Sequence, residues 1–178
     1  MKLLKRAIIV AACAAITTAV TATATNADTL SPSDRAKLTS AAVELRKAIL
    51  RTDATGVGQM ISHSEGLSCT DTRYKKAQVL RYLSNRNSIL YQSLFDAARF
   101  SRRCSAGYPR EYPATSEKAF FETAPGGSFE IEFVKGGYAT IKFISPKAGY
   151  YPREFTFKKE GADWMLSDGF IIGNCGCG

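Results

Sequence analysis

Four cysteines carry the most readily predicted chemistry of this sequence. Cys69, Cys104, Cys175 and Cys177 follow an N-terminal segment with the features of an export signal. An even number of cysteines in an exported chain favours two disulfides, and four cysteines permit three connectivities. The Cys175-Gly176-Cys177 tail allows two interpretations: a strained, redox-active or metal-binding pair, or two cysteines that bond elsewhere and hold the C-terminus against the helices. We expect the second, and no metal site, because spaced C-x-x-C pairs are missing.

The single histidine limits the catalytic chemistry that the sequence can support. His63 lies near Cys69 and Asp71, and this spacing would suit a Cys–His or His–Asp catalytic pair, but Cys69 is no nucleophile if it is disulfide-bonded. One histidine also excludes HExxH and His-rich metal motifs. Glu117 and Glu122 lie five apart and do not share a helix face as a hydrolase carboxylate pair would require. No phosphate-binding loop, GxSxG or dinucleotide fingerprint is present, and we predict no cofactor.

One charged residue interrupts an otherwise apolar strand face and is the strongest candidate for a binding site. Extrapolating the strand register places Arg153 on that face, with Asp168 directly opposite on the next strand. Buried charge in an apolar face is costly and often marks a functional site. We therefore predict that Arg153 and Asp168 form a ligand site walled by Tyr151 and Phe170. The alternative is that the sheet splays and both charges reach solvent.

The first 27 residues have the layout of a secretory signal peptide. Lys2, Lys5 and Arg6 precede an Ala-rich apolar run, and small residues before Ala27 suit cleavage there. A second interpretation treats Cys13 as the lipidated cysteine of a lipoprotein, although the apolar run continues beyond it. We predict cleavage near Ala27, a periplasmic or secreted protein, and no membrane span in the remaining chain.

Charge and composition favour one basic folded domain over residues 28–178. The 178-residue chain has 24 Lys and Arg against 16 Asp and Glu, and three of its basic residues precede residue 27, so residues 28–178 carry +5. This charge suits attraction to an anionic envelope polymer, lipid headgroups or an acidic protein. Arg99, Arg102 and Arg103 either complement a helix C-terminus or meet such a partner. Export and the lack of a basic–aromatic ladder argue against nucleic acid.

Residues 31–123 show helical periodicity. Ser31 and Pro32 begin the first predicted helix, which ends near Asp53. A short turn of helix follows, then a helix capped by Thr70 or Asp71. The spacing predicts a third helix from residues 89 to 100 and a short one capped by Ser116.

Residues 128–172 alternate apolar and polar side chains and predict a four-stranded antiparallel meander. A three-residue loop at 135–137 pairs Ile131 with Ile141, and a loop at 146–150 pairs Ile141 with Phe155. A Glu160-Gly161 turn would then pair Phe155 with Leu166. This register gives one apolar face and, on the other, a row formed by Glu130, Lys142 and Glu154.

Helices followed by such a meander resemble the NTF2-like and cystatin-like α+β folds. The segments that carry the resemblance are 128–134, 138–145, 153–159 and 162–170, with the Trp164-Met165-Leu166 strand near the end. The resemblance covers the topology of residues 28–178 and implies a cone with a pocket between helices and sheet. Domains of this kind include enzymes, binding proteins and interaction modules.

These observations predict an α+β domain with N-terminal helices packed on one face of a four-stranded meander, and a Cys-Gly tail at 173–178. The expected function is non-enzymatic binding of a small ligand or an envelope protein, as in an inhibitor or immunity protein. Two alternatives stay open: thiol-redox chemistry at Cys175 and Cys177, and an NTF2-like enzyme with its site near Arg153 and Asp168.

Overall fold

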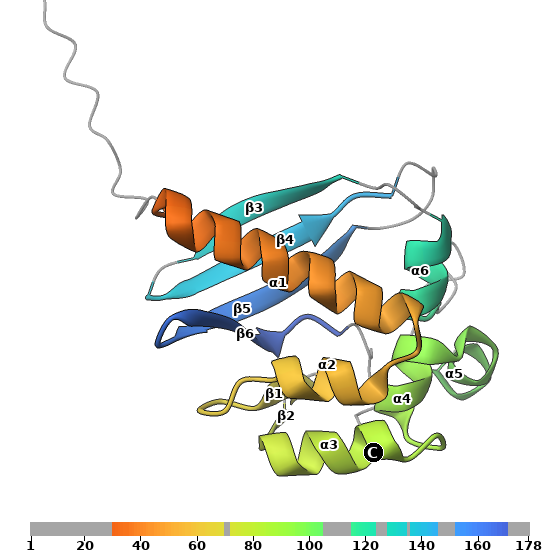
Figure 1. Cartoon of the computed structure of the whole chain (residues 1–178). Coiled ribbons are helices and arrows are strands. Elements are labelled where there is room, and N and C mark those ends of the chain that lie inside the picture. The colour runs from red at the N-terminus through yellow and green to blue at the C-terminus, as the bar shows by residue number, and fades with distance from the viewer. Residues whose placement is uncertain are drawn as a thin grey trace, which may run out of the picture.

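Within the residues that it describes, the structure, a computed structural model, contains six helices, a four-stranded antiparallel sheet and a two-stranded one (Figure 1). It describes residues 30–69, 72–104, 115–123, 128–134, 136–145 and 152–170. The predicted signal peptide, Tyr151, and the tail with Cys175 and Cys177 lie outside these residues. The predicted α+β class is confirmed.

The longest helix, α1 (Pro32–Leu50), begins as its sequence indicates. Ser31 caps it by accepting a hydrogen bond from the Asp34 amide, and Pro32 is its first residue. Its apolar face, which includes Leu38 and Leu45, is fully buried. The helix crosses one face of the sheet (Figure 1). Near its start, the Lys159 ammonium bonds the Asp34 carboxylate at 2.8 Å, which fixes α1 to the sheet.

The next segment differs from the prediction. Helix α2 (Ala54–Met60) is capped by Asp53, but a small hairpin of β1 (Leu67–Cys69) and β2 (Thr72–Tyr74) then replaces the expected helix start at Thr70 or Asp71. Helix α3 (Lys76–Ser84) begins only after it. Gly66 enters the hairpin at φ +72°, and a Cβ there would lie 1.9 Å from the Tyr74 carbonyl oxygen. Strands of three residues are too short for their alternation to be detected.

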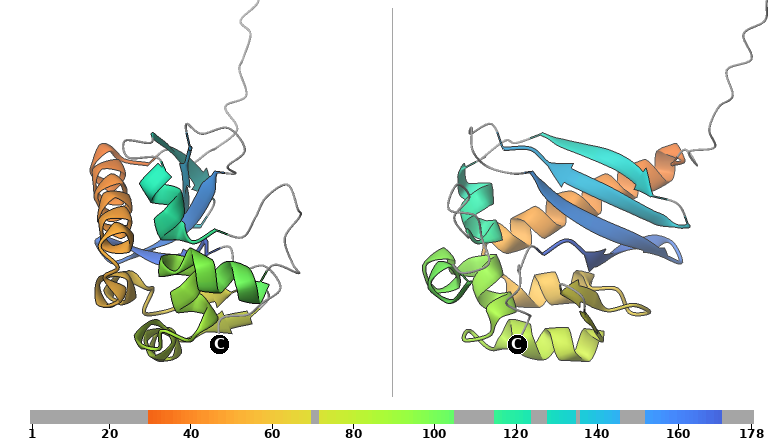
Figure 2. Two further views of the ribbon diagram at one scale, coloured as in Figure 1. Left: turned by 90° about the vertical axis from the view of Figure 1, so that its right-hand side faces the viewer. Right: turned by 180° about the vertical axis from the view of Figure 1, so that it is seen from behind.

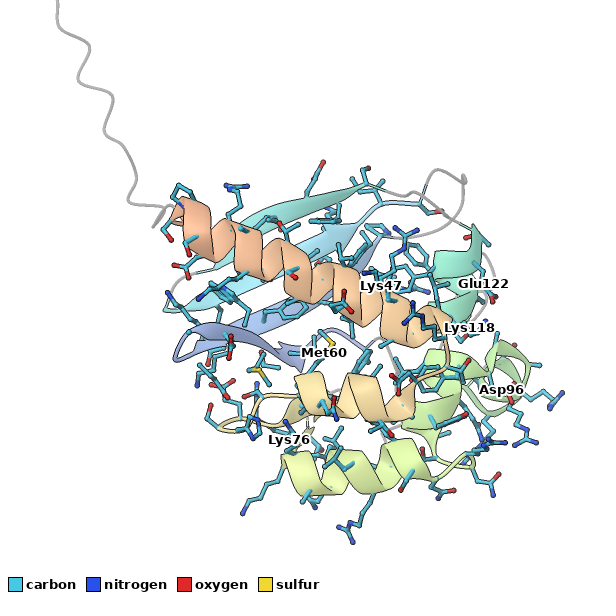
Figure 3. All side chains as sticks on the ribbon, viewed as in Figure 1. Lys47, Met60, Lys76, Asp96, Lys118 and Glu122 are labelled. Carbon is cyan, nitrogen blue, oxygen red and sulfur yellow. The ribbon has the colours of Figure 1, made fainter. Side chains whose placement is uncertain are left out.

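The remaining helices are short. The helix expected over 89–100 is two helices, α4 (Ile89–Phe95) and α5 (Ala97–Cys104), which meet at Asp96. Helix α6 (Glu117–Thr123) is capped as predicted, because the Ala119 amide donates to the Ser116 hydroxyl at 3.2 Å. Lys118 and Glu122 form an ion pair on this helix (Figure 3). No helix within the described ranges is both long and apolar enough to cross a membrane.

The large sheet has the predicted strand order and, over three strands, the predicted register. Strands β3 (Phe129–Val134), β4 (Tyr138–Phe143), β5 (Arg153–Glu160) and β6 (Asp163–Asp168) follow one another as a meander. Ile131 pairs with Ile141, and Ile141 pairs with Phe155. The charged row also forms: Lys142 lies 3.8 Å from Glu154 and 4.0 Å from Glu132, a diagonal neighbour, while Glu130 is its direct cross-strand partner.

The last strand pair corrects the predicted register. Glu160 pairs with Asp163, so the turn is Gly161-Ala162, and Phe157 lies opposite Leu166 instead of Trp164. A bulge between Thr156 and Phe157 then shifts the register again and places Asp168 opposite Thr156. Because one extra residue reverses the facing of those beyond it, Asp168 lies on the opposite face from Arg153.

Two faces of the sheet have different surroundings. Seen from behind, the strands of the large sheet lie in front of α1, and no helix of the described residues lies across them in this view (Figure 2). The face toward α1 buries an aromatic cluster, in which Phe155 and Phe157 are fully buried. Phe143 and Phe121 pack edge to face at 5.0 Å, and Phe121 stacks on Phe155 at 6.2 Å between ring centroids. This cluster joins α6 to the sheet.

Candidate functional site

Arg153 is buried as predicted, but its acidic partner is Glu117 of α6. Nε of Arg153 lies 3.0 Å from Oε2 of Glu117, and their side chains are 10% and 1% exposed. The guanidinium also lies over the Phe120 ring, 5.1 Å from its centroid. Burial raises the pKa of Glu117 to about 7, against the opposing effect of the Arg153 charge. The pair therefore links α6 to β5 inside the core.

The predicted pairing of Arg153 with Asp168 is wrong, because the bulge between Thr156 and Phe157 places Asp168 on the opposite face of the sheet. Asp168 accepts a hydrogen bond from the Gly169 amide at 2.7 Å, and burial raises its pKa, while the charge of Arg73 acts in the other direction. Phe170 is buried, with its ring 5.7 Å from that of Phe155, so it is a core residue. Tyr151 lies outside the described residues. The three described candidates, Arg153, Asp168 and Phe170, do not assemble into the site that the extrapolated register implied.

At the opposite end of the sheet, Glu160 binds the turn that follows α2. Its carboxylate accepts hydrogen bonds from the hydroxyls of Ser62 and Ser64 at 2.5 and 2.6 Å, and from the amides of His63 and Ser64 at 3.1 and 3.0 Å. Burial raises the pKa of Glu160, but these bonds outweigh it and lower the value to about 2. The Ser62 amide also donates to the Leu166 carbonyl of β6 at 2.8 Å. The turn is thus held rigidly against the sheet.

His63, the only histidine, takes part in this turn. Its Nε2 lies 3.0 Å from Nζ of Lys76, which also donates to the carbonyls of Gln59 and Ile61 at 3.0 and 2.8 Å. Figure 3 shows Lys76 at the start of α3, between that helix and α2. Lys76 therefore completes the C-terminal end of α2, where carbonyls lack helical partners. The structure thus places His63 against Lys76, in a structural contact, rather than in a catalytic pair with Cys69.

Glu65, one residue beyond the same turn, is the centre of a polar cluster. Its Oε1 accepts hydrogen bonds from the Tyr138 hydroxyl and, at 2.6 Å, from Nζ of Lys158, while Oε2 accepts from Arg73 at 3.0 Å. Burial raises the pKa of Glu65, and the bonds from Lys158 and Tyr138 lower it by more. The phenol pKa of Tyr138 is raised, chiefly by its bond to the Glu65 carboxylate. The ammonium of Lys158 lies 5.6 Å from the centre of the Tyr138 ring.

A pocket of about 500 Å³ opens at this cluster. It is lined by Ser64, Glu65, Arg73, Lys75 and Tyr138. These side chains come from the turn after α2, from β2 and its continuation into α3, and from the start of β4. The pocket therefore exists only because the small hairpin approaches the large sheet.

No sequence pattern predicts this pocket. Its residues are spread over 64–138 without a motif, and the sequence predicts the start of a helix close to where the hairpin that supplies Arg73 lies. The one available signal was the Ser62-His63-Ser64-Glu65 segment, whose polar side chains surround the only histidine. The sequence favours a structural or solvated His63 in that segment, and the polar contacts there are made by Glu160 and Glu65.

The cysteines fit a structural role. Cys69 and Cys104 are buried, with exposed fractions of 0% and 1%, and neither is a free thiol. They end β1 and α5, which lie at opposite sides of the helical layer (Figure 1). Within the residues that the structure describes, no group of three or more His, Cys, Asp and Glu side chains could hold a metal ion.

Comparisons with known proteins give no relative for this chain. No family model matches it, and no curated protein or solved structure does. The resemblance to NTF2-like and cystatin-like domains remains a proposal that rests on the order of helices and strands.

Proposed function

We propose that this chain is an exported protein that binds a small ligand or another protein without transforming it. The observation that carries the proposal is the pocket at Glu65. Its central carboxylate is held by three donors from three different elements, so the pocket is preorganised. A preorganised site loses little conformational entropy when a ligand binds.

The two alternatives have less support. An enzyme that used Arg153 and Asp168 together would need them on one face of the sheet, and the bulge separates them. A redox role needs accessible cysteines and would rest on Cys175 and Cys177. The two cysteines that the structure describes, Cys69 and Cys104, are buried and do not support such a role. Export rests on the N-terminal sequence pattern, and its test is the mass of the protein recovered after expression with its own leader. A mass that begins at Asp28 supports cleavage, and a diacylglyceryl adduct on Cys13 would favour the lipoprotein.

A thermal-shift screen of small molecules against the protein and its Tyr138→Ala variant tests the binding proposal. We expect a ligand that raises the melting temperature of the protein, fails to raise that of the variant, and is recovered unchanged by mass spectrometry. Arg35→Gln, at an exposed position on α1, is the control and should respond like the parent. Conversion of the ligand would favour an enzyme, and equal responses of parent and Tyr138→Ala would remove the pocket from consideration.

A further inference from the structure

Resting on the proposed function, we infer that the pocket at Glu65 binds an oxyanion, a carboxylate or phosphate group, through Arg73 and Lys75. Three of the five lining residues are charged, and two of these are cations. The one carboxylate, Glu65, is already neutralised by the ammonium of Lys158 at 2.6 Å. The cluster of Glu65, Arg73, Lys75 and Lys158 therefore keeps a formal charge of +2.

Arg73 has bonding capacity left for a ligand. Its bond to Glu65 uses one terminal nitrogen, Nη1, at 3.0 Å, and its side chain is 48% exposed. A guanidinium presents five N–H donors in a planar fork that matches carboxylate and phosphate oxygens. The Glu65 bond orients this fork while its other donors stay available. No ion pair of Lys75 is found among the described residues, and its side chain is exposed.

The start of α3 adds positive potential at the same rim. Lys75 is the N-cap of this nine-residue helix, and an ammonium cannot accept the bonds that a Ser or Asp cap would take. The first turn of α3 also contains no acidic residue. The side chain of Gln78 accepts from the Lys75 amide at 3.0 Å. The positive end of the helix dipole therefore lacks a negative partner from its own helix.

The other charges nearby are already bonded. Glu160 accepts four hydrogen bonds from the turn at 62–64, and Lys76 donates to two carbonyls. Asp168 is a further carboxylate whose charge interacts with that of Arg73, and it is partly buried and accepts a hydrogen bond from the Gly169 amide. The Tyr138 ring gives the pocket an aromatic wall, so the body of the ligand beside its anionic group is expected to be apolar or planar.

Titration of the ¹⁵N-labelled protein with succinate and, separately, with inorganic phosphate tests this inference by NMR. We expect saturable shifts at the amides of Ser64, Glu65, Arg73, Lys75 and Tyr138 with at least one probe. Tighter binding of succinate would identify a carboxylate ligand, and tighter binding of inorganic phosphate would identify a phosphate ligand. Lys75→Glu should weaken binding about tenfold or more, and Arg73→Gln should do the same, as expected for loss of a charge-assisted bond.

The double variant Arg35→Gln/Arg86→Gln is the control for non-specific charge, because it lowers the net charge by two, as Lys75→Glu does, at two exposed positions away from the pocket. It should keep the affinity of the parent. Absence of saturable shifts with both probes, or equal weakening by the control, would overturn the oxyanion inference. A neutral ligand from the thermal-shift screen that binds at Tyr138 would overturn it while leaving the proposed function intact. If the NMR spectrum of Lys75→Glu in the absence of a probe matches that of the parent, the variant is folded and its weaker binding reflects loss of the binding contact.

Discussion

Nε of Arg153 lies 3.0 Å from Oε2 of Glu117, and this buried ion pair joins the first residue of β5 to the first residue of α6. Both atoms lack any other hydrogen-bond partner among the described residues. The pair therefore depends on electrostatic attraction and on the contact of Arg153 with the Phe120 ring, and each residue requires the other.

The two single substitutions of this pair should have unequal costs. Glu117→Leu leaves a buried guanidinium that cannot lose its proton, and we expect a loss of about 3–5 kcal/mol in the free energy of unfolding. Arg153→Leu leaves a carboxyl whose burial already raises its pKa to about 7, so it can become neutral and the loss should be smaller. Urea denaturation at pH 6 measures both. The double Leu variant should be close to the parent, and additive losses would show that the two residues are independent.

Glu160 should make the stability of the protein fall at acid pH. Its folded pKa of about 2 lies below its ordinary value of 4.5, so between these values the unfolded chain binds more protons than the folded one. The stabilisation by this carboxylate is thus complete above about pH 4.5 and is lost as the pH falls toward 2. Glu160→Gln should be less stable at pH 7 and should show a weaker pH dependence over that range in thermal unfolding. A parallel pH profile of the variant would contradict this assignment.

Gly169 should tolerate no side chain. At φ +126°, a Cβ there would lie 2.4 Å from the Glu154 carbonyl oxygen and 2.6 Å from Cα of Phe155, both backbone atoms of the neighbouring strand. We expect Gly169→Ala to cost at least 3 kcal/mol, in the range of other strongly disruptive changes. Gly161→Ala is the control, because its φ is also positive, at +61°, but the Cβ would meet no atom within 4 Å. Equal destabilisation of the two variants would show that the backbone angle alone matters.

The disulfides should join Cys69 and Cys104 separately to the two tail cysteines. A disulfide needs Cα atoms within about 7 Å, and β1 and α5 lie at opposite sides of the helical layer (Figure 1). Peptide mapping without reduction should therefore recover one bond from each of Cys69 and Cys104 to the C-terminal peptide. A Cys69–Cys104 bond would contradict this, and a readily reduced Cys175–Cys177 bond would revive the redox alternative.

Two hairpins show how far alternation predicts register. At 129–143 the expected three-residue loop, which keeps the apolar side chains on one face, is the one that forms, and Phe129 pairs with Phe143. At 153–168 two turns satisfy the same face requirement, because moving the register by two residues preserves facing. Gly161, which has φ +61°, belongs to both possible turns, Glu160-Gly161 and Gly161-Ala162. Its presence in the sequence therefore does not tell which of the two turns forms. The bulge at Thr156 has no signature in the alternation at all.

Several helix starts, the order of the strands in the large sheet and the register of its first three strands follow from the sequence alone. Ser31 and Ser116 specify where helices begin, and the alternating residues from 129 to 157 specify a buried face, because caps and periodicity act between neighbours in the chain. Which charges form pairs depends on contacts between residues that are distant in the sequence. Arg153 meets Glu117, and Glu65 meets Lys158, 36 and 93 residues away in sequence. Such contacts depend on how a bulge, a short hairpin and a helix start are brought together in space, and no local pattern encodes that placement.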